Sequence, residues 1–367
     1  MTSPLRRSLP QLDGGLFLTD GGIETTLIFH DRMELPHFAA FVLLRAESGR
    51  AALRRYYTSH AGIARAQGLG FILESPTWRA SADWGARLGY SGAELAEANR
   101  QSIAMMRELR AELAAPETPV VISGCVGPRG DGYDPGQAMS PRAAEAYHAA
   151  QIDTLAEAGA DMIAALTMTN ATEAIGIARA AEGAGLPAAL SFTLGTDGRL
   201  PTGQSLGEAV AEVDAATGAS PAYYMLNCVH PIHFAPVLAA AELAGERWVK
   251  RLRGLRANAS KRSHEELNDS PGLDAGDPLR MEASMCKLFV TEAAFRVADQ
   301  AVQIHGGTGL IRGNPVEWLF RMLRMMRILT GTSEILRNTV AKELLEGAGT
   351  QPAAKALSAT AICTTAE

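Results

Sequence analysis

Short apolar runs between residues 15 and 262 each end in polar or glycine residues. Examples are FLTDGGIETT (17–26), FILESPTW (71–78) and YYMLNCVHP (223–231). Carboxylates, amides and thiols at such ends can bind an amino acid or activate a nucleophile, provided that the runs end at one common edge. The residues that we expect to line this site are Asp20, Gly21, Gly22, Glu24, Thr25, Glu74, Thr167, Asn227 and Asn258.

These polar ends also have structural explanations. Glu24 and Glu74 could cap helices or pair with arginines instead of contacting a substrate. Cys228 could be a small buried hydrophobic residue, and close packing could explain Cys125. The Asp20-Gly21-Gly22 stretch favours binding, because two glycines after a strand let backbone N–H groups approach a ligand carboxylate.

The apolar runs alternate with alanine-rich helical stretches such as 48–68, 140–160 and 170–186, each ending at or near a glycine. This alternation predicts βα units around a parallel sheet. We count seven strands, whereas a closed barrel needs eight. The predicted fold class is α/β: a TIM-like (β/α)8 barrel that lacks its regular eighth strand, followed by a C-terminal α-helical segment.

The helical segment replaces the expected eighth strand after the polar stretch 261–278. A helix from about Arg280 to Ile304 is apolar on more than one side, which predicts partners on both faces. Asn314-Pro315 caps a second helix, and Thr332 opens a third that stops at Gly347. The predicted domains are the barrel at 1–278, the helices at 279–347 and a disordered tail at 348–367.

Composition narrows the function classes. Hydrophobic residues make up 47% and charged residues 20% of the 367 residues, which is typical of a soluble globular protein and includes no apolar run of membrane-spanning length. The net charge of −6 gives no electrostatic reason to expect nucleic acid as a partner. No secretory signal is recognisable, and the four cysteines form no CxxC pair, so we expect a cytoplasmic protein.

Residues from about 15 to 278 resemble the homocysteine S-methyltransferase family. The motifs that carry the resemblance are LTDGGIETTL, GCVGPRGDGY, GRLPTGQSLGEAV, NCVHP and RLRGLRANAS. The resemblance implies methyl transfer from a methyl donor to a small thiol amino acid such as homocysteine. It also implies that Asp20, Gly21 and Gly22 bind the amino acid, and that Cys228 is one of three cysteine ligands of a zinc ion.

Zinc would ionise the acceptor thiol, and three thiolates would leave it one open position for substrate. The family's other two ligands are adjacent cysteines in a Gly-Gly-Cys-Cys-Gly run at the eighth strand. This chain has no such run after Asp277, and both Cys286 and Cys363 are isolated. The Gly-Gly pair after the short apolar run in QIHGG is superficially similar to the missing end of the eighth strand. His305, directly before this pair, is therefore a further candidate zinc ligand.

Residues 280–347 resemble the end of the C-terminal helical domain of acyl-CoA dehydrogenases, through QIHGGTG and GTSEI. The resemblance implies FAD contacts, because a glycine pair and a helix start can both approach a pyrophosphate. Thr330 stands where many members have a catalytic glutamate, and the family's other flavin-binding domains are missing. The alternative functions are therefore a flavin-binding module, an oligomerising module that forms homo-oligomers through these helices, or an inactive hybrid. The implied cofactor residues are Gln303, Gly306, Gly307, Thr332 and Glu334.

Overall fold

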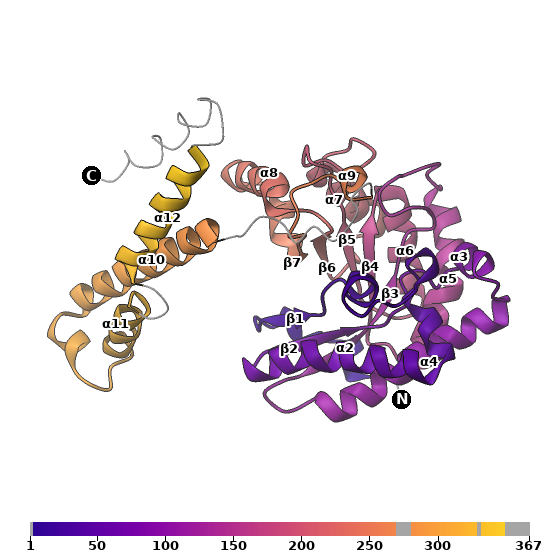
Figure 1. The fold of residues 1–367 in the computed structure, drawn as a ribbon, viewed down its shortest axis with the longest axis horizontal. Helices are drawn as coiled ribbons and strands as arrows, with labels where there is room; N and C mark the ends of the chain where they lie inside the picture. Colours follow the sequence, from indigo (N-terminus) through magenta and orange to yellow (C-terminus); the bar gives the residue numbers. More distant parts are fainter. Residues whose placement is uncertain (1–2, 269–279, 329–331, 349–367) are drawn as a thin grey trace. The chain divides into compact units, whose positions relative to one another are not determined.

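The computed structural model describes residues 3–268, 280–328 and 332–348. The chain forms two compact units, Met1–Ala275 and Gly276–Glu367. The first contains the sheet and the second contains three long helices (Figure 1).

A curled sheet of seven parallel strands forms the centre of the first unit (Figure 1). Its strands are β1 Phe17–Thr19, β2 Gly70–Glu74, β3 Val120–Val126, β4 Met162–Met168, β5 Ala188–Phe192, β6 Tyr223–Asn227 and β7 Leu252–Arg256. Each strand pairs with the next in chain order, so β1 and β7 are the two edges of the sheet. Within the described residues there is no eighth strand, and the predicted TIM-like barrel without its regular eighth strand is confirmed.

Burial explains why the middle strands consist almost entirely of apolar residues. Every residue of β2 to β6 is buried, as expected for a parallel sheet that is covered on both sides. The edge strands differ, because β1 is half-buried and β7 alternates between half-buried and exposed residues.

Helices follow the strands and begin and end at the predicted kinds of residue. Ser91 and Glu94 form a capping box at the start of α4, and Ser205 and Glu208 form one at the start of α7. Gly159 ends α5 in the left-handed conformation at φ 107°, which glycine adopts without steric cost. The helices of this unit are α1 Ile23–Thr25, α2 Glu47–Ala66, α3 Ala82–Arg87, α4 Gly92–Leu113, α5 Pro141–Ala158, α6 Ala171–Gly183, α7 Leu206–Thr217, α8 Pro231–Leu243 and α9 His264–Asn268.

The interior of the barrel is packed below its polar rim. At the amino-terminal ends of the strands, Leu9 packs into a cluster with Val121, Met162, Ala189, Tyr223 and Met225. Nearer the carboxyl ends, Cys125, Ala164 and Leu166 pack with the side chain of Trp78. The polar residues at the carboxyl ends of the strands therefore lie above a filled core, at what we call the mouth of the barrel.

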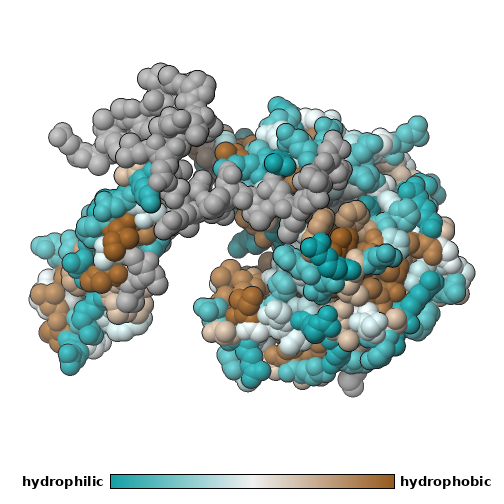
Figure 2. Space-filling model, viewed as in Figure 1, coloured by the Kyte–Doolittle hydropathy of each residue, from teal (hydrophilic) through white to brown (hydrophobic). Residues whose placement is uncertain are grey.

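The second unit consists of α10 Arg280–His305, α11 Pro315–Met326 and α12 Ser333–Ala348. The Asn314 side chain accepts a hydrogen bond from the backbone N–H of Val316 at 2.9 Å, which confirms the predicted cap. Phe295 and Phe320 join α10 to α11, with ring centres 5.1 Å apart. Hydrophobic residues also reach the surface of this unit (Figure 2). Apart from residue 348, which ends α12, the predicted tail lies outside the described residues.

None of the helices described is long and apolar enough to span a membrane.

Candidate functional site

Arg256, the last residue of β7, organises the mouth of the barrel. Its Nη2 donates to Asp20 Oδ1 at 2.7 Å, to the Asp20 carbonyl at 3.0 Å and to the Gly21 carbonyl at 2.6 Å. Its Nη1 donates to Glu74 Oε2 at the end of β2. One guanidinium group thus links the carboxyl ends of β1, β2 and β7 across the gap between the two sheet edges.

The charges in the mouth are buried, and burial dominates their protonation. Burial raises the pKa of Asp20, although Arg256 and His60 oppose the rise. Burial likewise raises the pKa of Glu74 to about 7, against the attraction of Arg256. Arg256 itself is disfavoured as a cation by burial, but the carboxylates of Asp20 and Glu74 bring its pKa above the usual value.

Glu24, in α1, is a third carboxylate at this site. Burial raises its pKa to about 7, and the negative charge of Asp20 adds to the rise. The Tyr56 hydroxyl donates to Asp20 Oδ2 at 3.2 Å, so the two oxygens of Asp20 have different partners. A carboxyl group with a pKa near neutrality can exchange a proton with a bound ligand at physiological pH.

Thr167 and Asn227 lie together but bind each other. The Thr167 N–H donates to Asn227 Oδ1, and Asn227 Nδ2 donates to Thr167 Oγ1, both at 2.9 Å. The Ser191 hydroxyl also donates to Asn227 Oδ1 at 2.6 Å. The side chain of Asn227 is therefore occupied by protein partners, and it orders the ends of β4, β5 and β6.

Cys228 follows directly after β6 in a left-handed conformation, with φ 55°, which is uncommon for a residue other than glycine. Its half-buried thiol accepts a hydrogen bond from Asn227 Nδ2 at 3.2 Å. The side chain of Tyr133 lies beside Cys228, and the Tyr133 ring stacks on His264 with centroids 3.6 Å apart. The thiol thus lies at the mouth among amide, hydroxyl and imidazole groups.

The other predicted substrate residues surround this centre. Gly21, Gly22 and Thr25 are exposed beside Asp20. Asn258 is half-buried beyond the end of β7, and its N–H donates to the Val229 carbonyl at 3.0 Å. The structure therefore places all nine predicted substrate residues at the carboxyl ends of the strands.

The described side chains do not supply a zinc site. Among them, no group of three or more His, Cys, Asp or Glu residues could hold a metal ion. The groups around Cys228 are an amide, a phenol and the imidazole of His264, and only the imidazole is a usual zinc ligand, so this place has fewer than three such ligands among the described residues. His305 ends α10 in the second unit and is exposed. Cys363 lies outside the described residues, as does the side chain of Cys286.

The structure does not gather the predicted flavin residues into one cluster. Gln303, Gly306 and Gly307 are exposed at the carboxyl end of α10. Thr332 and Glu334 lie at the start of α12, where the Ser333 hydroxyl donates to Glu292 Oε1 at 2.6 Å. Glu292 precedes Gln303 by about three helical turns on α10, which corresponds to roughly 16 Å. The two halves of the expected FAD site are therefore separated.

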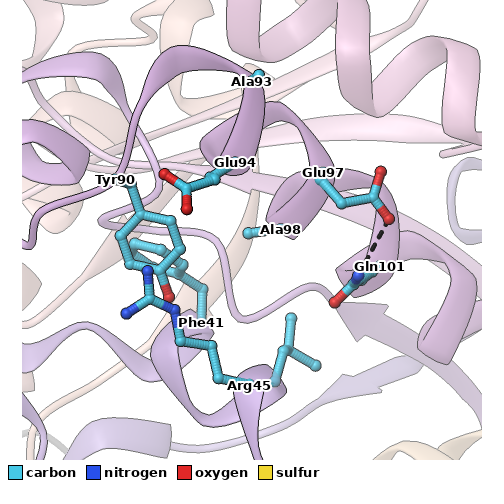
Figure 3. Close-up of a pocket in the computed structure, with 9 residues that line it drawn as sticks. Phe41, Arg45, Tyr90, Ala93, Glu94, Glu97, Ala98 and Gln101 are labelled. Atoms are coloured by element: carbon cyan, nitrogen blue, oxygen red, sulfur yellow. Dashed lines mark hydrogen bonds between the residues drawn. The ribbon is translucent and has the colours of Figure 1, made fainter.

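A pocket of about 340 Å³ lies on the outer helical layer and is separate from the mouth (Figure 3). It is lined by residues of α4 and of the 3-10 helix Ala40–Arg45, and by Tyr90. The Arg45 guanidinium stacks over the Tyr90 ring at 3.7 Å and fills part of the hollow. None of the predicted site residues lines this pocket.

Sequence reasoning missed Arg256 and Tyr56 as residues of the mouth. Arg256 could have been found, because it ends a predicted strand at the edge where Asp20 and Glu74 must be neutralised. Tyr56 lies on α2, and nothing in its sequence context singles it out from neighbouring aromatic residues.

Comparison with known proteins identifies both parts of the chain. A family model described as homocysteine S-methyltransferase matches residues 17–307, which extends beyond the predicted boundary into α10. The fold is similar to that of the homocysteine methyltransferase MmuM from Escherichia coli in its oxidised form. The TM-score is 0.56 and the identity 20%, over 71% of this chain and 97% of that one. The metallated form gives a TM-score of 0.54 and 22% identity, over 71% and 96%. This likeness concerns the fold alone.

The C-terminal region is similar to acyl-CoA dehydrogenases. (R)-benzylsuccinyl-CoA dehydrogenase from Thauera aromatica is 49% identical over 67 residues, which are 18% of this chain and 16% of that protein. The probable acyl-CoA dehydrogenase YngJ from Bacillus subtilis is 44% identical over 73 residues, or 20% and 19% of the two chains. The chain thus spans less than a fifth of the length of either relative.

Proposed function

The chain belongs to the homocysteine S-methyltransferase family, whose model matches it over residues 17–307, and we propose that it transfers a methyl group to the thiol of a homocysteine-like amino acid. The observation that carries the proposal is the cluster of Asp20, Glu24 and Glu74 at the mouth of the barrel. Active sites of such barrels lie at this end of the strands.

In the proposed reaction the acceptor sulfur forms a bond to the methyl carbon as the bond from that carbon to the donor breaks. The electron pair of the broken bond leaves with the donor, and the thiol proton must be taken up by a base. Glu24 suits this role, because its pKa of about 7 lets it accept a proton at neutral pH. Asp20, whose Oδ2 accepts only from Tyr56 among the described residues, would orient the acceptor ammonium.

Zinc enters no step of this proposal. In the family it would supply an ionised thiolate, but among the described residues Cys228 is the one half-buried thiol at the mouth, and Cys125 is buried in the packed interior below it. We expect well under one zinc ion per purified chain, because one thiolate cannot retain the metal against chelators. Plasma emission spectrometry measures this. Stoichiometric zinc that is lost in Cys228→Ala would contradict the expectation.

The activity can be tested with deuterated methyl donors and L-homocysteine. We would supply S-adenosylmethionine, S-methylmethionine and glycine betaine separately, and detect labelled methionine by mass spectrometry. Asp20→Asn should lower kcat/KM by at least about tenfold, since it removes the charge that binds the ammonium. Asp13→Asn, at an exposed position, is the matched control. If none of the three donors yields labelled methionine, the proposal fails.

Flavin binding by the second unit is the alternative proposal, but the similarity covers less than a fifth of either dehydrogenase, so most of a flavin site would have to come from elsewhere. We expect the purified protein to lack the absorbance of bound flavin near 450 nm. Both the reaction and the flavin test would be negative for an inactive hybrid.

A further inference from the structure

Arg79 is a buried cation that the proposed reaction does not use. It lies between β2 and α3, and its side chain is 7% exposed. Its Cζ atom lies 4.2 Å from the ring centre of Trp78 and 3.7 Å from that of Trp84. Its Nη1 donates to the Gly130 carbonyl at 3.0 Å. Two indole rings and one hydrogen bond therefore fix the orientation of the guanidinium.

The opposite edge of this guanidinium has no hydrogen-bond partner among the described residues. Its Nε is buried and unpaired. Its Nη2 lies 4.0 Å from Asp131 Oδ2, which is too long for a hydrogen bond. Leaving a buried charged donor unpaired is costly, so a partner is expected there. The Nε–Nη2 edge is a planar two-donor fork, which matches the two oxygens of a carboxylate.

Contacts of Trp78 place Arg79 at the mouth of the barrel. The Trp78 ring packs on Cys125 and Leu166 at the top of the interior, and its Nε1 donates to the Leu166 carbonyl at 3.3 Å. Gly127 permits this approach, because a Cβ atom there would lie only 2.5 Å from the Trp78 carbonyl oxygen. Arg79 is also attracted by the charge of Glu24. The mouth thus presents carboxylates and, nearby, a fixed cation with a free edge.

We propose that Arg79 binds the carboxylate of the acceptor amino acid through its Nε–Nη2 edge. This inference rests on the proposed function and adds a binding residue to it: the ammonium group faces Asp20, and the carboxylate faces Arg79. Asp131 competes for the same edge from the solvent side, where its side chain is 53% exposed. The alternative is a purely structural role, in which Arg79 packs between Trp78 and Trp84 and water hydrates its Nε–Nη2 edge.

Calorimetric titration with two ligands separates these roles. L-Homocysteine carries the carboxylate, and 3-mercaptopropylamine has the same thiol and amine without it. We expect Arg79→Lys to weaken L-homocysteine binding by at least about tenfold, because lysine keeps the charge but loses the fork. Binding of the amine should stay within about twofold. Asp131→Asn should strengthen L-homocysteine binding by at least about twofold, by removing the competing charge.

Arg87→Lys is the matched control, because Arg87 is exposed and stacks on the same Trp84 ring at 4.6 Å. It should change neither affinity. Equal weakening of both ligands by Arg79→Lys would show a structural role and overturn the inference, as would unchanged binding of both. If Arg79→Lys does not fold, Asp131→Asn decides, and an unchanged affinity for L-homocysteine overturns the inference. Wild-type protein that binds neither ligand would instead refute the proposed function.

Discussion

At the scale of single residues, the mouth is held together by opposite charges whose partners come from distant strands. Arg256 ends the last strand, and its carboxylate partners are Asp20, directly after β1, and Glu74, the last residue of β2. Removing one member of a buried ion pair leaves the other charge uncompensated, which is more costly than the pair is stabilising. The same arginine therefore links the two edge strands of the open sheet at the mouth.

We expect Arg256→Met to lower the free energy of unfolding by about 3–5 kcal/mol, because Asp20 and Glu74 would remain buried without a cation. Urea denaturation followed by tryptophan fluorescence measures the change. Arg253→Met, at an exposed position of the same strand, should change stability by less than about 0.5 kcal/mol. Equal effects of the two variants would show that Arg256 is not a structural link.

Glu24 should make stability depend on pH. Its pKa rises from 4.5 to about 7 on folding, so the folded state binds the proton more tightly than the unfolded state. Its contribution is fully present below pH 4.5 and is lost as the pH rises through 7. Glu24→Gln should therefore be more stable than wild type at pH 8, and this advantage should shrink towards pH 5. Urea denaturation at both pH values checks this, and parallel profiles would contradict it.

A residue of the mouth was predictable from the sequence only where the strand that it ends or follows could be predicted. Asp20, Glu74 and Asn227 were found because they end apolar runs, and strand ends share one edge of a parallel sheet. Their partners were not predictable, because the reach of Arg256 across the open edge depends on three-dimensional curvature. The mutual hydrogen bonds of Thr167 and Asn227 likewise depend on the registers of β4 and β6 against β5, which lies between them.

At the scale of elements, the strands and helices followed from local patterns. The strands begin within about a residue of the apolar runs, and α11 and α12 begin where the capping residues predicted. The packing of Leu9 under the barrel was not predicted, because the N-terminal segment has no repeating apolar pattern. The two apolar sides of α10 were predicted to need partners, but which side is covered within the unit depends on the neighbouring helices.

The two edge strands should open more readily than the centre of the sheet. Within the described residues β1 pairs with β2 alone and β7 with β6 alone, so each has hydrogen bonds on one side only. We expect backbone amides of β1 and β7 to exchange with deuterium at least about tenfold faster than those of Ile122 and Ile163 on central strands. Mass-spectrometric or NMR exchange measures this. Equal protection would indicate that another segment or chain covers the edges.

At the scale of the whole molecule, the chain joins a methyltransferase-like barrel to part of a helical domain that occurs elsewhere in a much larger protein. Large exposed hydrophobic residues are concentrated in this second unit relative to its length. Val297 and Ile304 lie exposed on α10, while Phe295 on the same helix packs against Phe320 of α11. One face of α10 is therefore covered within the unit, and the other is not. The exposed set is Val297, Ile304, Leu310, Ile311, Trp318, Leu319, Met325, Met326, Ile328 and Ile335.

We expect this surface to bind a second copy of the chain, so that the purified protein forms dimers or larger assemblies. Exposed apolar patches of this kind mark interfaces or aggregation sites on soluble proteins, and a symmetric dimer would bury the same face of both copies.

Replacing Ile304, which is 84% exposed, by Glu should shift the assembly towards monomer, because the carboxylate could not be desolvated at low cost. Arg312→Glu, also exposed but polar from the outset, is the control. Truncation after residue 279 should abolish assembly altogether. Light scattering coupled to gel filtration measures the mass in each case, and a monodisperse monomer for the full chain would show that these helices bury their apolar face without a second copy.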